Sequence, residues 1–291
     1  MKRAALMLML LLLLLAGVPC MGAEPAEVAA TDLRVMSYNV MWEENGVRAG
    51  NKTLPVWQER RKLVRDILRR HQPDVVGLQE TSPEQQVGLA EDNPGYGILY
   101  DRKLNNTNPI LYRADRFNVS SSGAFVLNDR PEKPDTNIGV RKASFARLVD
   151  RRTGQPFTVF NIHLDGRGDG STRRISAVRL AERMAAERNP VILTGDFNCR
   201  RTSPTLQFFL GEKALPNDTG ESSKSPRPLR DSLLTTDPDH KLIDFVMVDP
   251  DFKVRSAVQL RDVDRKASDH FPVLAVVSLG KAEEEDTRSE P

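Results

Sequence analysis

The segment Val191-Ile-Leu-Thr-Gly-Asp-Phe-Asn198 is the most informative stretch of this chain for its fold. Its first three residues form an apolar run suited to a strand buried on both faces, and Gly195 then permits a tight exit from that strand. Asp196 and Asn198 follow with one residue between them, so a carboxylate and an amide reach the edge of a sheet. Because α/β proteins place their reactive groups at such edges, the segment predicts an α/β fold with a site at a strand end.

The same arrangement, an apolar strand beside polar side chains, recurs along the chain. The polar residues at these positions are Asn39, Glu80, His163, Asp244 and the segment Ser268-Asp-His270. Each instance alone is weak evidence, because Asp and Asn commonly cap strands and helices. Together they predict that carboxylate, amide and imidazole groups meet at one edge of the fold.

Hydrophobic periodicity divides the chain into many short strands and few helices. We expect helices at residues 56–71 and 172–187, where apolar residues recur at helical spacing. We expect strands at residues 33–38, 75–78, 98–100, 110–112, 124–127, 144–149, 157–163, 191–193, 243–248, 254–260 and 271–277, and a long surface loop at 216–228. This pattern fits two packed sheets that are covered by helices on the outside.

Short motifs run through the chain in a fixed order. They are Met36-Ser-Tyr-Asn39, Gly77-Leu-Gln-Glu80, Asn108-Pro-Ile-Leu-Tyr112, Asn161-Ile-His-Leu-Asp165, Thr194-Gly-Asp-Phe-Asn198, Ile243-Asp244 and Ser268-Asp-His-Phe271. In these motifs the chain resembles the endonuclease/exonuclease/phosphatase family of deoxyribonuclease I-like, metal-dependent phosphoesterases, and it looks closest to exported bacterial-type members. The resemblance implies a four-layer α/β sandwich, two packed mixed β-sheets flanked by helices, in one domain over residues 31–279.

Hydrolysis of a phosphate ester requires neutralisation of the phosphoryl oxygens, an activated water and help for the leaving group. Glu80 supplies a hard oxygen donor, which favours Mg²⁺ or Mn²⁺ as the cofactor, and Asp269 is the second expected metal ligand. The chain has only 4 histidines and a single cysteine beyond residue 23, so a zinc cluster is not expected.

The other catalytic residues have expected roles at the phosphate. Asp196 orients or deprotonates the attacking water, while Asn198 and Asn39 donate hydrogen bonds to phosphate oxygens. His270 donates to the charge that develops at phosphorus, and the resemblance assigns Asp244 as the carboxylate that keeps it cationic. Whether Asp196 or His270 is the base stays open.

Two departures from the family pattern concern the surroundings of His163, which we expect to meet the phosphate from the side opposite His270. Relatives usually carry a second histidine where this chain has Gly166, and a glutamate where it has Asn106. An amide can position an imidazole but cannot hold its positive charge, so these positions put the protonation of His163 in question. They also keep open that the chain is a non-catalytic binding module on the same fold.

Pairs of arginines offer contacts to an anionic substrate. Arg173, Arg174, Arg200 and Arg201 lie close in sequence to the predicted site, and we expect them to bind substrate. The arginine pairs at 60–61 and 69–70 lie on the first predicted helix, where we expect a solvated face.

The two ends of the chain have compositions of their own. Residues 1–23 carry Lys2 and Arg3, then an apolar run and a small-residue exit, which predicts a signal peptide and an exported, periplasmic or secreted protein. An uncleaved membrane anchor is the alternative. Removal of the two basic residues brings the formal net charge from +2 to zero. Residues 281–291 are acidic, and we expect them to form a disordered tail.

These features predict an exported Mg²⁺-dependent phosphoesterase, a phosphodiesterase in preference to a phosphomonoesterase acting on sugar or inositol phosphates. Nucleic acid, a lipid headgroup and a small phosphate ester all stay open as the substrate, because this fold hosts all three. Neutral charge and an aromatic content of 6% argue against extended nucleic-acid binding. We expect a monomer without a stable protein partner.

Overall fold

The structure is a computed structural model that describes residues 31–43, 54–104, 107–128, 140–217, 219–233 and 242–279. The expected signal peptide, the expected acidic tail and Asn106 lie outside these residues. No helix of the described ranges is both long and apolar enough to cross a membrane.

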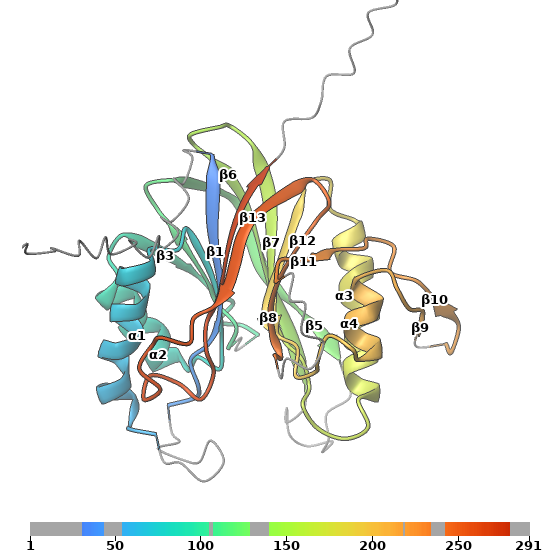
Figure 1. The fold of residues 1–291 in the computed structure, drawn as a ribbon, viewed down its shortest axis with the longest axis horizontal. Coiled ribbons are helices and arrows are strands. Elements are labelled where there is room, and N and C mark those ends of the chain that lie inside the picture. Colours follow the sequence, from blue (N-terminus) through green and yellow to red (C-terminus); the bar gives the residue numbers. More distant parts are fainter. Residues whose placement is uncertain are drawn as a thin grey trace, which may run out of the picture.

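Two six-stranded sheets stand side by side at the centre of the molecule (Figure 1). The first has the order β13-β14-β1-β2-β4-β3 and the second the order β11-β12-β8-β7-β6-β5. In the first sheet the strands are Phe252–Gln259 (β13), Val273–Leu279 (β14), Asp32–Asn39 (β1), Val75–Gln79 (β2), Ile110–Arg113 (β4) and Tyr96–Leu99 (β3). In the second they are Arg230–Asp231 (β11), Asp244–Val248 (β12), Val191–Asp196 (β8), Pro156–His163 (β7), Arg141–Asp150 (β6) and Phe117–Asn128 (β5).

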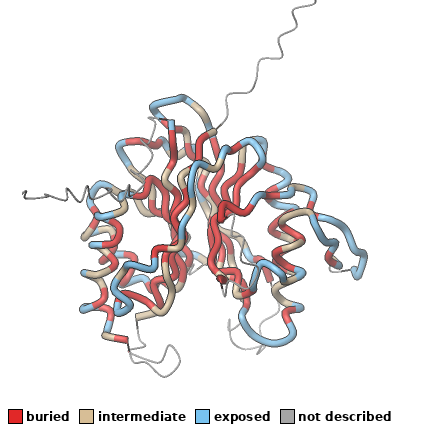
Figure 2. The backbone as a smooth tube through the Cα atoms, in the orientation of Figure 1, coloured by how far each residue is buried: buried red, intermediate tan, exposed pale blue. Residues whose placement is uncertain are grey.

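Helices cover the outer faces of both sheets, which completes the predicted four-layer sandwich (Figure 1). Helices α1 (Trp57–His71) and α2 (Pro83–Asp92) lie outside the first sheet, and α3 (Ser171–Ala185) and α4 (Pro204–Phe209) outside the second. Figure 2 shows buried residues concentrated in the strands and on the inward faces of the helices. The predicted fold class is therefore confirmed.

One parallel pair of strands lies in each sheet of the described structure, and a helix connects its members. Strands β1 and β2 are parallel and are joined through α1, while β7 and β8 are parallel and are joined through α3. Parallel strands end at the same edge of a sheet, so Asn39 is paired with Gln79 and His163 with Asp196. These two pairs of strand ends carry most of the candidate site.

The two predicted helices are confirmed with ends shifted by one or two residues, whereas α2 and α4 were not predicted. Both of these helices are short, but each begins with a Ser-Pro pair. The Ser82 hydroxyl accepts a hydrogen bond from the backbone of Gln85 in a capping box, and the Ser203 hydroxyl accepts one from the backbone of Leu206 at the start of α4. The capping residues, rather than apolar periodicity, were the available signal.

The predicted strands are present, with differences at their ends, and the largest difference in length is in β5. Strand β5 is 12 residues long where four were predicted, because polar residues interrupt the apolar pattern of an edge strand. The predicted loop at 216–228 also holds part of a small two-stranded sheet, formed by Leu215–Pro216 (β9) and Ser222–Ser223 (β10).

Candidate active site

The ends of four neighbouring strands bring acid, amide and imidazole groups together between the two sheets. Asn39 ends β1 and Glu80 follows β2, while His163 ends β7 and Asp196 ends β8. Asp244, the first residue of β12, is directly paired with Asp196 because β12 is antiparallel to β8. The strand register therefore places residues that are far apart in the sequence at one edge.

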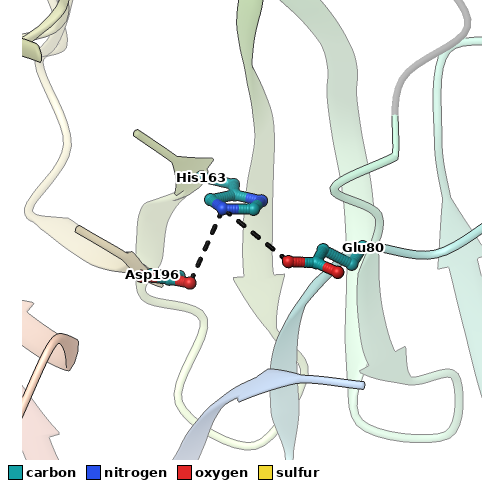
Figure 3. A group of neighbouring side chains, drawn as sticks. All are labelled: Glu80, His163 and Asp196. Atoms are coloured by element: carbon teal, nitrogen blue, oxygen red, sulfur yellow. Dashed lines mark ion pairs between the residues drawn. The ribbon is translucent and has the colours of Figure 1, made fainter. Parts of the chain in front are cut away.

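Glu80, His163 and Asp196 surround a common point (Figure 3). His163 Nε2 lies 3.9 Å from Glu80 Oε1 and 3.6 Å from Asp196 Oδ2. Asn39 joins the two carboxylates, because its Nδ2 donates to Glu80 Oε1 at 3.0 Å and to Asp196 Oδ2 at 3.1 Å. One amide thus links the first sheet to the second within the site.

His270 and Asp244 form the second part of the site. His270 Nδ1 lies 2.7 Å from Asp244 Oδ2, while His270 Nε2 faces Asp196 Oδ2 at 3.8 Å. The Ser268 hydroxyl donates to the carbonyl of Asn39 at 2.7 Å and accepts from the His270 backbone at 3.1 Å. This hydroxyl therefore fixes the His270 loop to the end of β1.

Left-handed backbone conformations shape the loops that carry these groups. Met41, Glu80 and Asn198 have φ values of 61°, 56° and 50°, in the region that residues other than glycine seldom occupy. Local hydrogen bonds hold two of these turns: Asn39 Oδ1 accepts from the Met41 backbone at 2.9 Å, and Asp196 Oδ1 accepts from the Asn198 backbone at 2.8 Å. The reactive side chains are thus positioned by their own neighbours.

The charges at the site are strongly coupled. Burial lowers the pKa of the His270 ring, but the charge of Asp244 and its hydrogen bond outweigh burial and raise the pKa to about 10. Burial, with the neighbouring Asp244, raises the pKa of Asp196 above its usual range. His270 is therefore cationic at neutral pH.

In the group of Glu80, His163 and Asp196 the imidazole is neutral, in contrast to the cationic ring of His270. Burial lowers the pKa of His163, and Arg141 adds to this effect, so its ring is neutral at neutral pH. Burial also acts to raise the pKa of Glu80, but His163 and the hydrogen bond from Asn39 outweigh it and lower that pKa. Glu80 is therefore ionised beside a neutral imidazole.

The donor set fits a divalent cation. Two groups have donor atoms within 4.8 Å of one another, Glu80 with His163 and Asp196, and Asp196 with Asp244 and His270. Carboxylate oxygens suit Mg²⁺ or Mn²⁺, and the pKa of Asp196 is raised by burial first and by the charge of Asp244 second, both of which a bound cation would offset. Asp269, the second ligand expected from the sequence, belongs to neither group, although it lines a cavity beside His270.

A buried polar network joins the two sheets directly beneath the site. Gln79 Nε2 donates to Asn161 Oδ1 at 2.7 Å, and the Thr194 hydroxyl donates to the same oxygen at 3.1 Å. Gly77 lies against this network, since a Cβ there would come within 2.0 Å of Thr194 Oγ1 and 2.6 Å of Asn161 Oδ1. Each of these polar residues precedes a site residue by one or two positions. The network therefore sets the distance between the strand ends of the two sheets that carry the site.

Arg60 is completely buried, which corrects the expectation of a solvated face at this position. Its guanidinium has no carboxylate partner among the described residues and donates instead to backbone carbonyls. The acceptors are the carbonyls of Val40 at 2.6 Å, Ala267 and Pro55 at 3.0 Å, Met41 at 3.1 Å and Trp42 at 3.3 Å. Arg60 therefore ties the loop after Asn39 to the loop before His270.

The four arginines expected to bind substrate have different surroundings. Arg173 Nη1 donates to the carbonyl of Asp165 at 2.6 Å, and Arg174 Nη1 donates to that of Asp169 at 3.1 Å. Arg200 and Arg201 are both exposed. Arg201 forms ion pairs with Asp231 at 3.6 Å and with Glu212 at 3.8 Å. Only Arg173 thus touches the segment that carries His163.

Sequence reasoning missed Arg141, which lies at the start of β6. Its Nη2 donates to Asp165 Oδ1 at 3.1 Å, and its charge acts on His163. No motif marks this residue, because strand pairing of β6 with β7 is what brings it to the site.

Gly166, one of the two departures, has a steric role in this structure. A Cβ at this position would lie 2.7 Å from Asn198 Oδ1, and Asn198 Nδ2 donates to the Leu164 carbonyl at 2.9 Å. A larger residue at 166 would therefore displace Asn198 from its present position.

A two-sheet sandwich with these groups at one edge is the architecture of deoxyribonuclease I-like hydrolases of phosphate esters. The chain belongs to the Endonuclease/Exonuclease/phosphatase family, whose model matches residues 36–270. This match includes every residue of the two clusters.

Solved structures with this fold include bacterial proteins. A family member from Bacteroides thetaiotaomicron is 26% identical, with a TM-score of 0.69, and the match covers 86% of this chain and 99% of that one. A mannosyl-6-phosphatase from the same organism is 26% identical, with a TM-score of 0.68, and the match covers 85% of this chain and 100% of that one.

Among sequence relatives, nocturnin of Drosophila melanogaster is 24% identical over 211 residues. That match covers 64% of this chain but 32% of nocturnin. The chain is thus similar to part of this longer protein.

Proposed function

We propose that the chain is an exported, Mg²⁺-dependent phosphoesterase that hydrolyses phosphate esters by in-line attack of water. The observation that carries the proposal is the meeting of Glu80, Asn39 and Asp196 with His163 and His270 at one edge of the sandwich, where the surroundings shift the pKa values of the two imidazoles in opposite directions. A pure binding module would need no such separation of charge states. Export is supported by the composition of residues 1–23.

The residues divide the work of hydrolysis. A divalent cation, held by Glu80 with Asp196 beside it, would neutralise phosphoryl oxygens and polarise the ester. The cationic His270 donates a hydrogen bond to the charge that develops on the phosphoryl group, and Asp244 keeps its proton in place. Asp196 orients the attacking water, and the amide of Asn39 fixes the carboxylate in that position.

A phosphodiesterase is our first candidate, and a phosphomonoesterase is the second. The second is favoured by the likeness to the mannosyl-6-phosphatase, which covers 85% of this chain. Either reaction needs the same cation and the same cationic imidazole. They differ only in the group on the phosphorus that the site must accommodate.

The test is hydrolysis of bis(p-nitrophenyl) phosphate and of p-nitrophenyl phosphate by the purified protein without residues 1–23, with Mg²⁺ and with EDTA. A His270→Ala variant, prepared in parallel, controls for contaminating phosphatases. We expect turnover that requires Mg²⁺ and is lost in the variant, and the ratio of the two rates distinguishes diesterase from monoesterase. Equal turnover by the variant would refute the site, and no turnover with either compound would favour the binding module.

A further inference from the structure

A cavity of about 480 Å³ lies beside His270, and none of Glu80, His163 and Asp196 is among its lining residues. Asp244, Asp269 and His270 line it together with Arg261 and Arg265. Its volume is within the range of about 300–1,000 Å³ that is usual for sites of small ligands. The cavity therefore has room for part of a substrate beyond the phosphate that reacts.

The two arginines of this cavity are held without being neutralised. Arg265 stacks on Phe271, with its Cζ 4.2 Å from the ring centroid, and Arg261 Nε donates to Gln259 Oε1 at 2.9 Å. Among the described residues, neither guanidinium has a carboxylate within 4.0 Å. The stacking and the hydrogen bond restrict both side chains, yet leave their charge available.

A nearby acid is already used by another arginine. Asp262 lies next to Arg261 in the sequence but pairs with Arg70 on helix α1 at 2.9 Å. Asp244, which also lines the cavity, is likewise paired with His270. The lining thus combines the two restrained guanidinium groups and the cationic His270 with the carboxylates of Asp244 and Asp269, and this excess of positive charge favours an anionic ligand.

We infer that this cavity binds a second phosphate group of the same substrate, carried at some distance from the ester bond that is cleaved. The inference rests on the proposed function and narrows its substrate class to esters with at least two phosphates. A guanidinium matches the oxygen geometry of a phosphate and can donate two parallel hydrogen bonds. The second phosphate can belong to a neighbouring nucleotide or to a small bisphosphate.

The test compares substrates that differ by one phosphate. One pair is the thymidine dinucleotide TpT and its 5′-phosphorylated form pTpT; the other is fructose 6-phosphate and fructose 1,6-bisphosphate. The measured quantity is the ratio of kcat/KM within each pair, in the presence of Mg²⁺. The pair with the larger ratio identifies the source of the second phosphate.

Both arginines are exposed, so Arg261→Gln and Arg265→Gln should leave the fold intact, which thermal unfolding checks. We expect the wild-type protein to prefer the member with two phosphates, and each substitution to reduce this preference by about tenfold. The matched control is Arg151→Gln, an exposed arginine in the turn between β6 and β7, at the far end of β7 from His163. It should keep the wild-type ratio. A kcat/KM ratio that is equal in the wild type and in the double variant, which carries both Arg261→Gln and Arg265→Gln, would overturn the inference.

Calorimetric titration of the wild type and of the double variant with pTpT and with fructose 1,6-bisphosphate separates this inference from the proposed function. If no ester is hydrolysed, the proposed function fails, but tighter binding by the wild type than by the double variant would still support the subsite. If esters are hydrolysed and both proteins bind these probes equally, the function stands and the subsite is wrong.

Discussion

Replacement of Arg60 by lysine tests how strongly the site depends on one buried cation. The substitution keeps the positive charge and removes the planar fork. An ammonium group has three hydrogens, so it can serve at most three of the carbonyls of Val40, Met41, Trp42, Pro55 and Ala267 that Arg60 now contacts.

The cost follows from the carbonyls that are left without a donor. The Met41 carbonyl keeps a second donor, Gln85 Nε2 at 2.9 Å, so one or two of the others lose their partner. Each such buried group costs about 1–3 kcal/mol, and we expect Arg60→Lys to lower the free energy of unfolding by about 2–4 kcal/mol. Activity should fall as well, because the same bonds hold the loops of Asn39 and His270.

Urea denaturation followed by tryptophan fluorescence measures this change. The chain has 2 tryptophans, and both report on Arg60: Trp57 has its ring 5.4 Å from the guanidinium carbon, and Trp42 offers its carbonyl. The control is Arg65→Lys on the same helix, whose partner is Asp66, and which should change stability by less than about 0.5 kcal/mol. If Arg60→Lys is as stable as this control, the reasoning is refuted.

Other substitutions probe the site from different directions. In the wild type the raised pKa of His270 keeps its ring cationic until about pH 10. Asp244→Asn removes the strongest of the charges that raise this pKa, while burial still lowers it and Asp196 and Asp269 still raise it, so the pKa falls. The kcat/KM defect should then be small at low pH and grow by about tenfold for each pH unit above the lowered pKa, and a defect independent of pH in the rate profile would contradict the role of Asp244. Glu80→Gln should raise the Mg²⁺ concentration for half-maximal activity by about tenfold or more, and a metal titration with an unchanged midpoint would exclude Glu80 as a ligand. Gly77→Ala places a Cβ 2.0 Å from Thr194 Oγ1 and should cost about 1–3 kcal/mol, visible as a lower Tm; an unchanged Tm would show that the sheets can separate freely.

The central strands were predictable because their signal is local. Strand β8 begins with three apolar residues and ends with Thr194, Gly195 and Asp196, and all of its residues are buried, as expected for a strand covered on both faces. Helix α1 was predictable for the same reason. Helix α2 was not, because its stability depends on capping by Ser82 and on packing against α1 more than on an apolar stripe.

The site was predictable as a set of residues but not as a geometry. Asp196 and Asp244 are paired through strand register, which depends on contacts across the sequence. Arg60 was misjudged because its acceptors are carbonyls of distant loops, which leave no trace in a helical pattern. Arg201 was expected at the site because it is close to Asn198 in the sequence, but its side chain pairs with Asp231.

The position of β14 has a consequence for the order in which the molecule acquires activity. Strand β14, nearly the last described part of the chain, pairs with β1, nearly the first, and His270 lies immediately before it. A ribosome releases the segments of Asn39, Glu80, His163 and Asp196 long before that of His270, so a nascent chain cannot have a complete site until synthesis passes β14. The proposed activity therefore requires residues as far as β14, and a truncation before Val273 should remove it even where the remaining strands still fold.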